Sequence, residues 1–221
     1  MARRGDLNGW WRFGIAVVGA VMWLFFRIRV VGAERIPPTG PAIVASNHLS
    51  ALDGVVLALV VGRSGLRMTR FLVAAEFFPK PAFGWALRTY RQIPLHRGEG
   101  DVHALDEAIR TVRSGALAGI FPEGRVNPSP EDGLQRGRTG VARIALGSDA
   151  VVVPVGIWGT HRRYPQQGLH FRRPWRPTVA IVFGSPMRAE GDPRSTQDTQ
   201  RFTELLMERI EEQVDEARRR S

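Results

Sequence analysis

Short apolar runs alternate with longer amphipathic stretches along most of the chain. The runs 40–47 (GPAIVASN) and 178–185 (TVAIVFGS) are almost entirely apolar and are bounded by turn residues. This pattern is typical of strands that are buried on both faces of a sheet. The stretch 101–115 (DVHALDEAIRTVRSG) instead repeats its apolar positions at helical spacing, which indicates an amphipathic helix.

The order of these patterns predicts the fold class. Strands and helices alternate, which is typical of a single α/β domain whose mixed, largely parallel sheet is flanked by helices. Because Pro94 cannot donate a backbone hydrogen bond, we expect its strand at the edge of the sheet. The predicted strands are 27–37, 40–47, 70–76, 91–96, 117–124, 150–159 and 178–185, and the predicted helices are 52–62, 81–90, 101–115, 140–148 and 199–220.

The N-terminal segment is interpreted separately. The apolar run 13–26 lies between Arg12 and Arg27, and as a helix it would span about 21 Å, less than the hydrocarbon core of about 30 Å. No cleavage site follows it, which argues against a signal peptide. We expect residues 1–29 to form an amphipathic, apolar membrane anchor that is monotopic at the cytoplasmic face, and residues 30–221 to form one domain. The alternative is a helix buried against the core of that domain.

The charge of the chain favours an anionic partner. The formal net charge is +10, and Lys80 is the single lysine among 31 basic residues. A nucleic acid, an anionic phospholipid surface or a phosphorylated substrate would each match this surplus. The chain contains no cysteine, so it has no disulfide and no thiol nucleophile.

A histidine and an aspartate lie close together in the stretch 46–53 (SNHLSALD). In one interpretation His48 is a general base that Asp53 orients. In the other, Ser46 or Asn47 caps a helix, Asp53 lies on the exposed face of that helix, and the histidine is incidental. On one continuous helix, residues five positions apart point about 140° apart. The first interpretation therefore requires His48 to lie in a loop or a first helical turn, with Asp53 reaching back to it.

Three further stretches follow or lie within predicted strands, where ligands gather in α/β sheets: 93–98 (IPLHRG), 121–125 (FPEGR) and 153–156 (VPVG). Together with 46–53, in this order, they resemble the motifs of the 1-acylglycerol-3-phosphate acyltransferase family of glycerolipid enzymes, which includes glycerol-3-phosphate acyltransferases. The resemblance covers about residues 30–185. Its specific part is the pairing of the H-x4-D motif with F-P-E-G.

The resemblance implies roles for the histidine and the aspartate. His48 would take a proton from a glycerol hydroxyl that attacks an acyl thioester, and imidazole suits this because its pKa is about 6.5. Asp53 would hold the imidazole in the right tautomer and stabilise the imidazolium. Pro154 in the last motif would shape the strand beside the acyl site.

The resemblance also implies an acceptor site. Arg97 and Gly124 would bind the acceptor phosphate, with Arg125 beside them, while Glu123 would accept from the glycerol hydroxyl or fix Arg97. The chain departs from the usual family residues at several positions of these motifs. We therefore expect a more cationic acceptor pocket than usual, formed by Arg91, His96, Arg97 and Arg125.

The function that follows is a membrane-surface O-acyltransferase. It would move a fatty acyl group from acyl-CoA or acyl carrier protein to lysophosphatidic acid, giving phosphatidic acid, at a membrane with anionic lipids. Glycerol 3-phosphate or another lysolipid or glycolipid is the alternative acceptor. Residues 30–221 would be the acyltransferase domain, and we expect no cofactor beyond the acyl donor.

Other classes of function match the chain less well. It has no G-x-S-x-G motif, and its five histidines lack the spacing of a zinc site, so we expect neither a covalent hydrolase nor a metal enzyme. The net charge and six tryptophans could suit a nucleic-acid-binding protein. The arginines are spread along the chain without a known recognition module, however, and we expect no nucleic acid partner.

Overall fold

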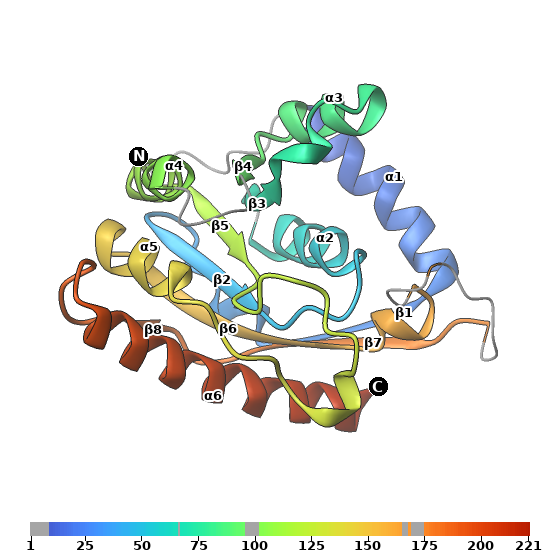
Figure 1. The fold of residues 1–221 in the computed structure, drawn as a ribbon. Coiled ribbons are helices and arrows are strands. Elements are labelled where there is room, and N and C mark those ends of the chain that lie inside the picture. The colour runs from blue at the N-terminus through green and yellow to red at the C-terminus, as the bar shows by residue number, and fades with distance from the viewer. Residues whose placement is uncertain (1–8, 66, 96–101, 165–167, 169–174) are drawn as a thin grey trace.

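In a computed structural model of the chain, which describes residues 9–65, 67–95, 102–164, 168 and 175–221, one sheet lies between two layers of helices (Figure 1). The strands are β1 (Arg27–Val31), β2 (Ala42–Ser46), β3 (Thr69–Ala74), β4 (Ile93–Leu95), β5 (Leu117–Ile120), β6 (Val151–Trp158), β7 (Thr178–Phe183) and β8 (Met187–Arg188). The α-helices are α1 (Gly9–Phe25), α2 (Asp53–Gly65), α3 (Pro81–Thr89), α4 (Val102–Arg113), α5 (Gly140–Ser148) and α6 (Thr196–Arg220).

The sheet is mixed and largely parallel. Its strand order is β1-β7-β6-β2-β5-β3-β4, and β8 pairs with β6 outside this path. Strand β6 runs antiparallel to β7 and β8, while the other neighbouring pairs are parallel. The predicted fold class is confirmed, and β4, which contains Pro94, lies at the edge as expected.

Both faces of the central strands are buried, which explains their uninterrupted apolar runs. In β7, Val179 and Ile181 pack into the core that the sheet shares with α1 and α2. Ala180 and Val182 pack into the opposite core, beneath α4, α5 and α6. This alternation follows from the two-residue period of a strand, which sends successive side chains to opposite faces.

Pro154 lies in the central strand β6, a position where proline normally disrupts a sheet. Its carbonyl accepts from the N–H of Gly184, so its nitrogen also faces the side of β6 that pairs with β7 and β8. The register places Pro154 between these two pairings, because β8 pairs with residues 151–152 of β6 and the pairing of β6 with β7 begins at Val155. The missing N–H of proline therefore removes no ladder hydrogen bond.

Helix α1 packs one side on the domain and exposes the other. Trp11 and Met22 are buried, and Ile15 lies against Gly62 of α2. Within the described part of the chain, no helix combines the length and apolar character needed to cross a bilayer. Residues 27–29, which the sequence places in the anchor segment, lie in β1 and pair with β7.

Gly156 of β6 permits the close approach of α6. A Cβ atom at this position would lie 2.1 Å from the carbonyl carbon of Gln213 and 2.3 Å from the nitrogen of Val214, both in the α6 backbone. Because a helix backbone cannot move aside as a flexible side chain can, the glycine sets the distance between the helix and the sheet.

We expect Gly156→Ala to lower the free energy of unfolding by about 2–3 kcal/mol, since it forces α6 away from β6. Gly140→Ala is the matched control, because a Cβ there meets nothing within 4 Å. Urea unfolding of both variants measures the difference. Equal stability of the two variants would contradict this account of the packing.

Candidate active site

The carboxyl ends of three neighbouring parallel strands carry the site. Strands β6, β2 and β5 are adjacent in that order, and both pairings are parallel. The segments that follow them begin at Asn47, Phe121 and Gly159. Ligands of α/β sheets gather at this edge because the following loops supply polar groups there.

His48 and Asp53 form a hydrogen-bonded pair in the segment after β2. His48 lies in the loop and Asp53 is the first residue of α2, as the general-base interpretation requires. The distance from His48 Nδ1 to Asp53 Oδ2 is 3.0 Å. A carboxylate accepts only, so the proton of a neutral imidazole lies on Nδ1 and its lone pair on Nε2. The His48 side chain is 18% exposed and that of Asp53 is 0% exposed, so the pair can receive a substrate from the histidine side only.

The loop folds around the Asp53 carboxylate. The backbone N–H groups of Leu49 and Ser50 donate to Oδ2, at 2.6 and 2.7 Å. These bonds orient the carboxylate and give the buried charge the partners that it needs. The alternative interpretation, with Asp53 on an exposed helix face, is therefore wrong for this fold.

Two buried side chains fix the backbone on either side of His48. The Asn47 amide donates to the carbonyl of Ile157 at 2.9 Å and accepts from the N–H of Ile157 at 2.8 Å, which joins the loop to β6. Glu123 Oε1 accepts from the N–H of His48 at 2.8 Å. The N–H of Asn127 donates to the carbonyl of His48 at 2.7 Å. The histidine is thus held by segments about 75 and 110 residues away.

Glu123 has partners within the protein for both carboxylate oxygens. Its Oε2 accepts from the backbone N–H and the side-chain amide of Gln135, at 3.0 and 3.3 Å, and the residue is 3% exposed. Burial raises the pKa of Glu123, and hydrogen bonds from the backbone N–H groups of Gln135 and His48 oppose this shift. The described contacts hold the loop that carries His48, and the expected contact with an acceptor hydroxyl stays a prediction.

Phe121 covers one face of the His48 imidazole. The two rings are stacked with their centroids 4.1 Å apart and their planes at 12°. Phe71 also stacks on Phe121, with the two ring centroids 5.7 Å apart. The stacked ring covers this face of the imidazole and fixes the plane in which it lies.

Gly124 and Arg125 follow Glu123 and lie in or directly after a hydrogen-bonded turn. The N–H of Gly124 donates to the carbonyl of Phe121 at 2.9 Å, and Gly124 has a φ of 72° that favours glycine. A Cβ there would also lie 2.7 Å from Nε of Arg138. Arg125 is exposed and donates from Nε to Gln135 Oε1 at 2.5 Å. Contact of either residue with a phosphate remains a prediction.

The predicted acceptor pocket lies partly outside the described residues. Arg97 and His96 belong to the segment 96–101, which the structure does not describe. Arg91 is exposed and has a φ of 51°, at the turn between α3 and β4. The expected grouping of these residues with Arg125 therefore stays a prediction.

Thr160 also belongs to the site, although the motifs in the sequence do not include it. Its hydroxyl donates to Asp53 Oδ1 at 2.5 Å, and both residues are fully buried. Thr160 follows β6 and the turn residue Gly159, whose φ is 106° and whose added Cβ would lie 2.2 Å from the carbonyl oxygen of Thr178. A polar residue after a glycine at the carboxyl end of a predicted strand is the signal that could have found it.

The fold and the site define an α/β protein with a histidine–aspartate pair at the carboxyl edge of a largely parallel sheet. The chain belongs to the Acyltransferase family, which it matches over residues 27–158.

Three known proteins show where the similarity lies. An uncharacterised protein of Mycobacterium leprae is 35% identical over 64% of this chain and 39% of its own length, so the chain matches less than half of that relative. The N-acylphosphatidylethanolamine synthase of Arabidopsis thaliana is 31% identical over 68% of this chain and 57% of that protein. The solved structure of the 1-acyl-sn-glycerophosphate acyltransferase of Thermotoga maritima superposes with a TM-score of 0.70 at 23% identity, covering 94% of this chain and 79% of that one, which shows a shared fold.

Proposed function

We propose that the protein transfers a fatty acyl group from acyl-CoA or acyl carrier protein to the hydroxyl of lysophosphatidic acid, giving phosphatidic acid. The observation that carries the proposal is the pairing of a partly exposed His48 with the fully buried Asp53, at 3.0 Å, in a member of the Acyltransferase family. The fold of the Thermotoga acyltransferase, whose name specifies an acylglycerophosphate, supports the choice of acceptor.

The proposed reaction uses His48 first as a base and then as an acid. Nε2 takes the proton of the acceptor hydroxyl while its oxygen attacks the thioester carbonyl. Asp53 stabilises the imidazolium through its hydrogen bond with Nδ1. The aromatic face of Phe121, which is stacked on the imidazole, adds an attraction to the cation that forms during the reaction. The carbon–sulfur bond then breaks, and the leaving sulfur takes the proton from the imidazolium. The products are an ester and a free thiol, and no covalent enzyme intermediate is needed.

The acceptor phosphate would need groups that donate hydrogen bonds to it. We assign the binding of the phosphate to Arg97, Gly124 and Arg125, because an arginine fork matches phosphate oxygens and a glycine lets a backbone N–H approach them. Glu123 would contribute by holding the N–H of His48, the contact it makes in the structure. Glycerol 3-phosphate or another lysolipid would satisfy the same groups.

A second acceptor is favoured by one comparison. The Arabidopsis relative is named for a product in which the nitrogen of phosphatidylethanolamine carries the acyl group. A general base at His48 could deprotonate an ammonium group as it does a hydroxyl. The two acceptors give different linkages, an ester or an amide, and product analysis separates them.

The membrane is the proposed location of the acceptor, and α1 is the proposed contact with it. An exposed apolar stripe runs along this helix at helical spacing, formed by Trp10, Phe13, Val17, Val21 and Leu24. The ring of Trp10 also packs edge to face against that of Trp85 of α3, with their centroids 5.9 Å apart. Trp85 and Phe83 of α3 are exposed as well. Together they form one apolar surface on which a bilayer could dock.

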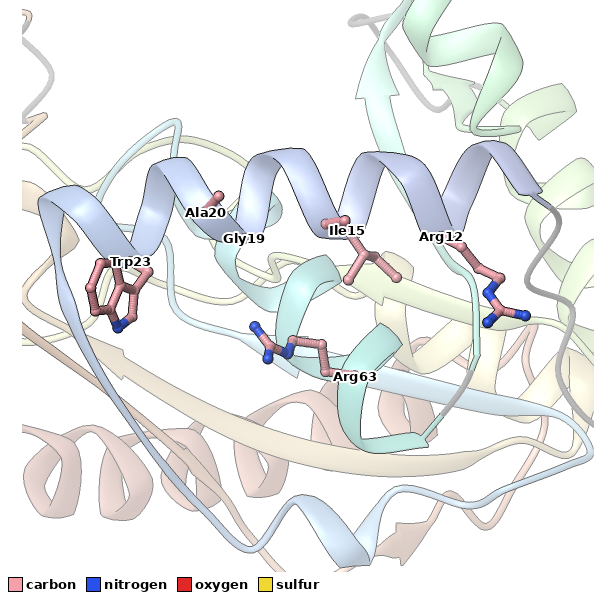
Figure 2. A pocket seen from close by; sticks show the side chains of 7 residues that line it. Arg12, Ile15, Gly19, Ala20, Trp23 and Arg63 are labelled. Carbon is pink, nitrogen blue, oxygen red and sulfur yellow. The ribbon is translucent and has the colours of Figure 1, made fainter.

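The flank of this stripe is cationic. An open groove of about 520 Å³ runs between α1 and α2, with Arg12 and Arg63 along it and Trp23 at one end (Figure 2). Helices α1, α2 and α3 carry one acidic residue among them, the buried Asp53 of the site. The apolar stripe and this cationic flank match a bilayer with anionic headgroups, such as the cytoplasmic leaflet, and the protein would be monotopic there.

We expect His48→Ala to lower acceptor-dependent thiol release from acyl-CoA by about 10²–10⁴-fold, because it removes the general base. Asp53→Asn should also lose most of the rate, by a smaller factor than His48→Ala. His103→Ala, an exposed histidine on α4, is the matched control. A loss below about tenfold for His48→Ala, in a variant that unfolds like the wild type, would overturn the mechanism.

We expect the triple change of Phe13, Val17 and Leu24 to serine to weaken binding to phosphatidylglycerol vesicles at least tenfold, since each side chain contributes about 1.5–3 kcal/mol when fully buried. These three side chains are exposed, whereas deleting the helix would also remove the buried Trp11 and Met22. Co-sedimentation with vesicles measures binding. Leu205→Ser on α6 is the control and should bind like the wild type. Unchanged binding of the triple variant would place the contact elsewhere.

A further inference from the structure

The two oxygens of the Asp53 carboxylate have different partners. Oδ2 accepts from the N–H groups of Leu49 and Ser50 and lies 3.0 Å from Nδ1 of His48. Oδ1 accepts from the Thr160 hydroxyl at 2.5 Å. Asp53 and Thr160 are both 0% exposed, so bulk water does not reach this contact. One oxygen therefore faces the imidazole, and the other is satisfied by a residue 107 positions away.

We propose that Thr160 is a positioning residue, which sets the orientation of the Asp53 carboxylate and, through it, that of the His48 imidazole. This inference rests on the proposed function, because it assigns Thr160 a part in the reaction attributed to the pair.

The physical need for a partner at Oδ1 comes from the carboxylate itself. The terminal torsion of aspartate is broad, so the group can rotate unless both oxygens are held. A buried charged oxygen without a donor is also costly. If Oδ1 lost its donor, rotation of the carboxylate toward other donors would displace Oδ2 from Nδ1 and release the imidazole from its orientation.

Thr160 is well placed to resist that rotation. It begins the 3-10 helix Thr160–Arg162 directly after β6 and Gly159. Its carbonyl accepts from the N–H groups of Arg163 and Tyr164, both at 3.1 Å, so its backbone is fixed. A second bond joins the same two segments, because the Ser50 hydroxyl donates to the carbonyl of Tyr164 at 2.6 Å.

This arrangement makes the end of β6 part of the catalytic unit. Asn47 already pairs with Ile157 of β6, so the loop that carries His48 contacts this segment at Asn47, Ser50 and Asp53. The first and second contacts fix the backbone of the loop. Of these three contacts with the segment around β6, only that of Thr160 acts on the carboxylate that touches the imidazole, so its loss should change the turnover rather than the binding of substrates.

Thr160→Val removes the hydroxyl and keeps the branched shape. We expect kcat for acyl transfer to fall about ten- to a hundredfold, the range expected when a charged group loses a hydrogen bond. The KM values for acyl-CoA and for lysophosphatidic acid should stay within about twofold. Thr160→Ser keeps the donor and should restore kcat to within a few-fold of the wild type. Thermal unfolding of both variants accompanies the kinetics.

A double-mutant cycle with Asp53→Asn separates positioning from a general structural role. If Thr160 acts through Asp53, Thr160→Val should cost little further rate in the Asp53→Asn background. An equal loss of kcat in both backgrounds would overturn the inference. So would a fall in thermal stability with raised KM values for both substrates and no rescue by serine.

Failure of this inference is distinguishable from failure of the proposed function. If His48→Ala and Asp53→Asn abolish acyl transfer while Thr160→Val keeps the wild-type kcat, the inference on Thr160 alone is wrong. If His48→Ala retains acyl transfer, the pair is not the catalytic centre, and both proposals fail together.

Discussion

The buried charge of Asp53 is the constraint on which the site depends. A carboxylate that is fully removed from solvent must be paired or hydrogen-bonded, or the folded state pays a large free-energy penalty. Here the donors are the N–H groups of Leu49 and Ser50, the His48 imidazole and the Thr160 hydroxyl. Satisfying this one group therefore fixes the course of the loop, the orientation of the histidine and the position of the segment after β6.

The sheet supplies the rigidity that this arrangement needs. Strands β6, β2 and β5 are parallel neighbours, so their carboxyl ends bring together three segments that are far apart in the chain. Apolar cores on both faces hold the strands, and α6 lies close against β6 at Gly156. Asn47 and Glu123 then tie the backbone beside His48 to two of the three segments. A side chain fixed in this way needs little reorganisation to act as a base.

Local patterns in the sequence were sufficient to predict much of the fold. Apolar runs located the strands, and the spacing of His48 and Asp53 set a geometric condition that the structure meets. The predicted ends of the strands and helices were less accurate than their positions. The strand predicted at 117–124 ends at Ile120, because a turn containing Pro122 follows, and the last helix begins at Thr196, where the Ser195 hydroxyl accepts from the N–H of Asp198.

The remaining features depend on contacts between distant residues. Thr160 meets Asp53 across 107 positions, and Asn47 meets Ile157 across 110, so no local pattern reveals either contact. The same holds for the bond from the N–H of His48 to Glu123, which joins residues 75 positions apart, whereas the contact of Glu123 with an acceptor stays a prediction.

Helix α1 shows that an apolar run does not by itself indicate which face of a helix is buried. Every position from 13 to 26 except glycine is apolar, so the sequence does not distinguish the face packed on α2 from the face left exposed. Packing decides it, because Ile15 fits against Gly62 and Leu59 fits against Gly19. The packed-helix interpretation therefore describes the side of α1 that lies on α2, and the anchor interpretation, which concerns the exposed side, stays a prediction.

Product analysis by mass spectrometry tests the central claim most directly. The wild-type protein and His48→Ala would be incubated with acyl-CoA in phosphatidylglycerol vesicles that contain lysophosphatidic acid and phosphatidylethanolamine, with glycerol 3-phosphate in solution. The account predicts phosphatidic acid and an equal amount of free CoA from the wild type, and neither product above background from the variant. Release of free fatty acid without any acylated acceptor, or the same acylated product from both proteins, would contradict it.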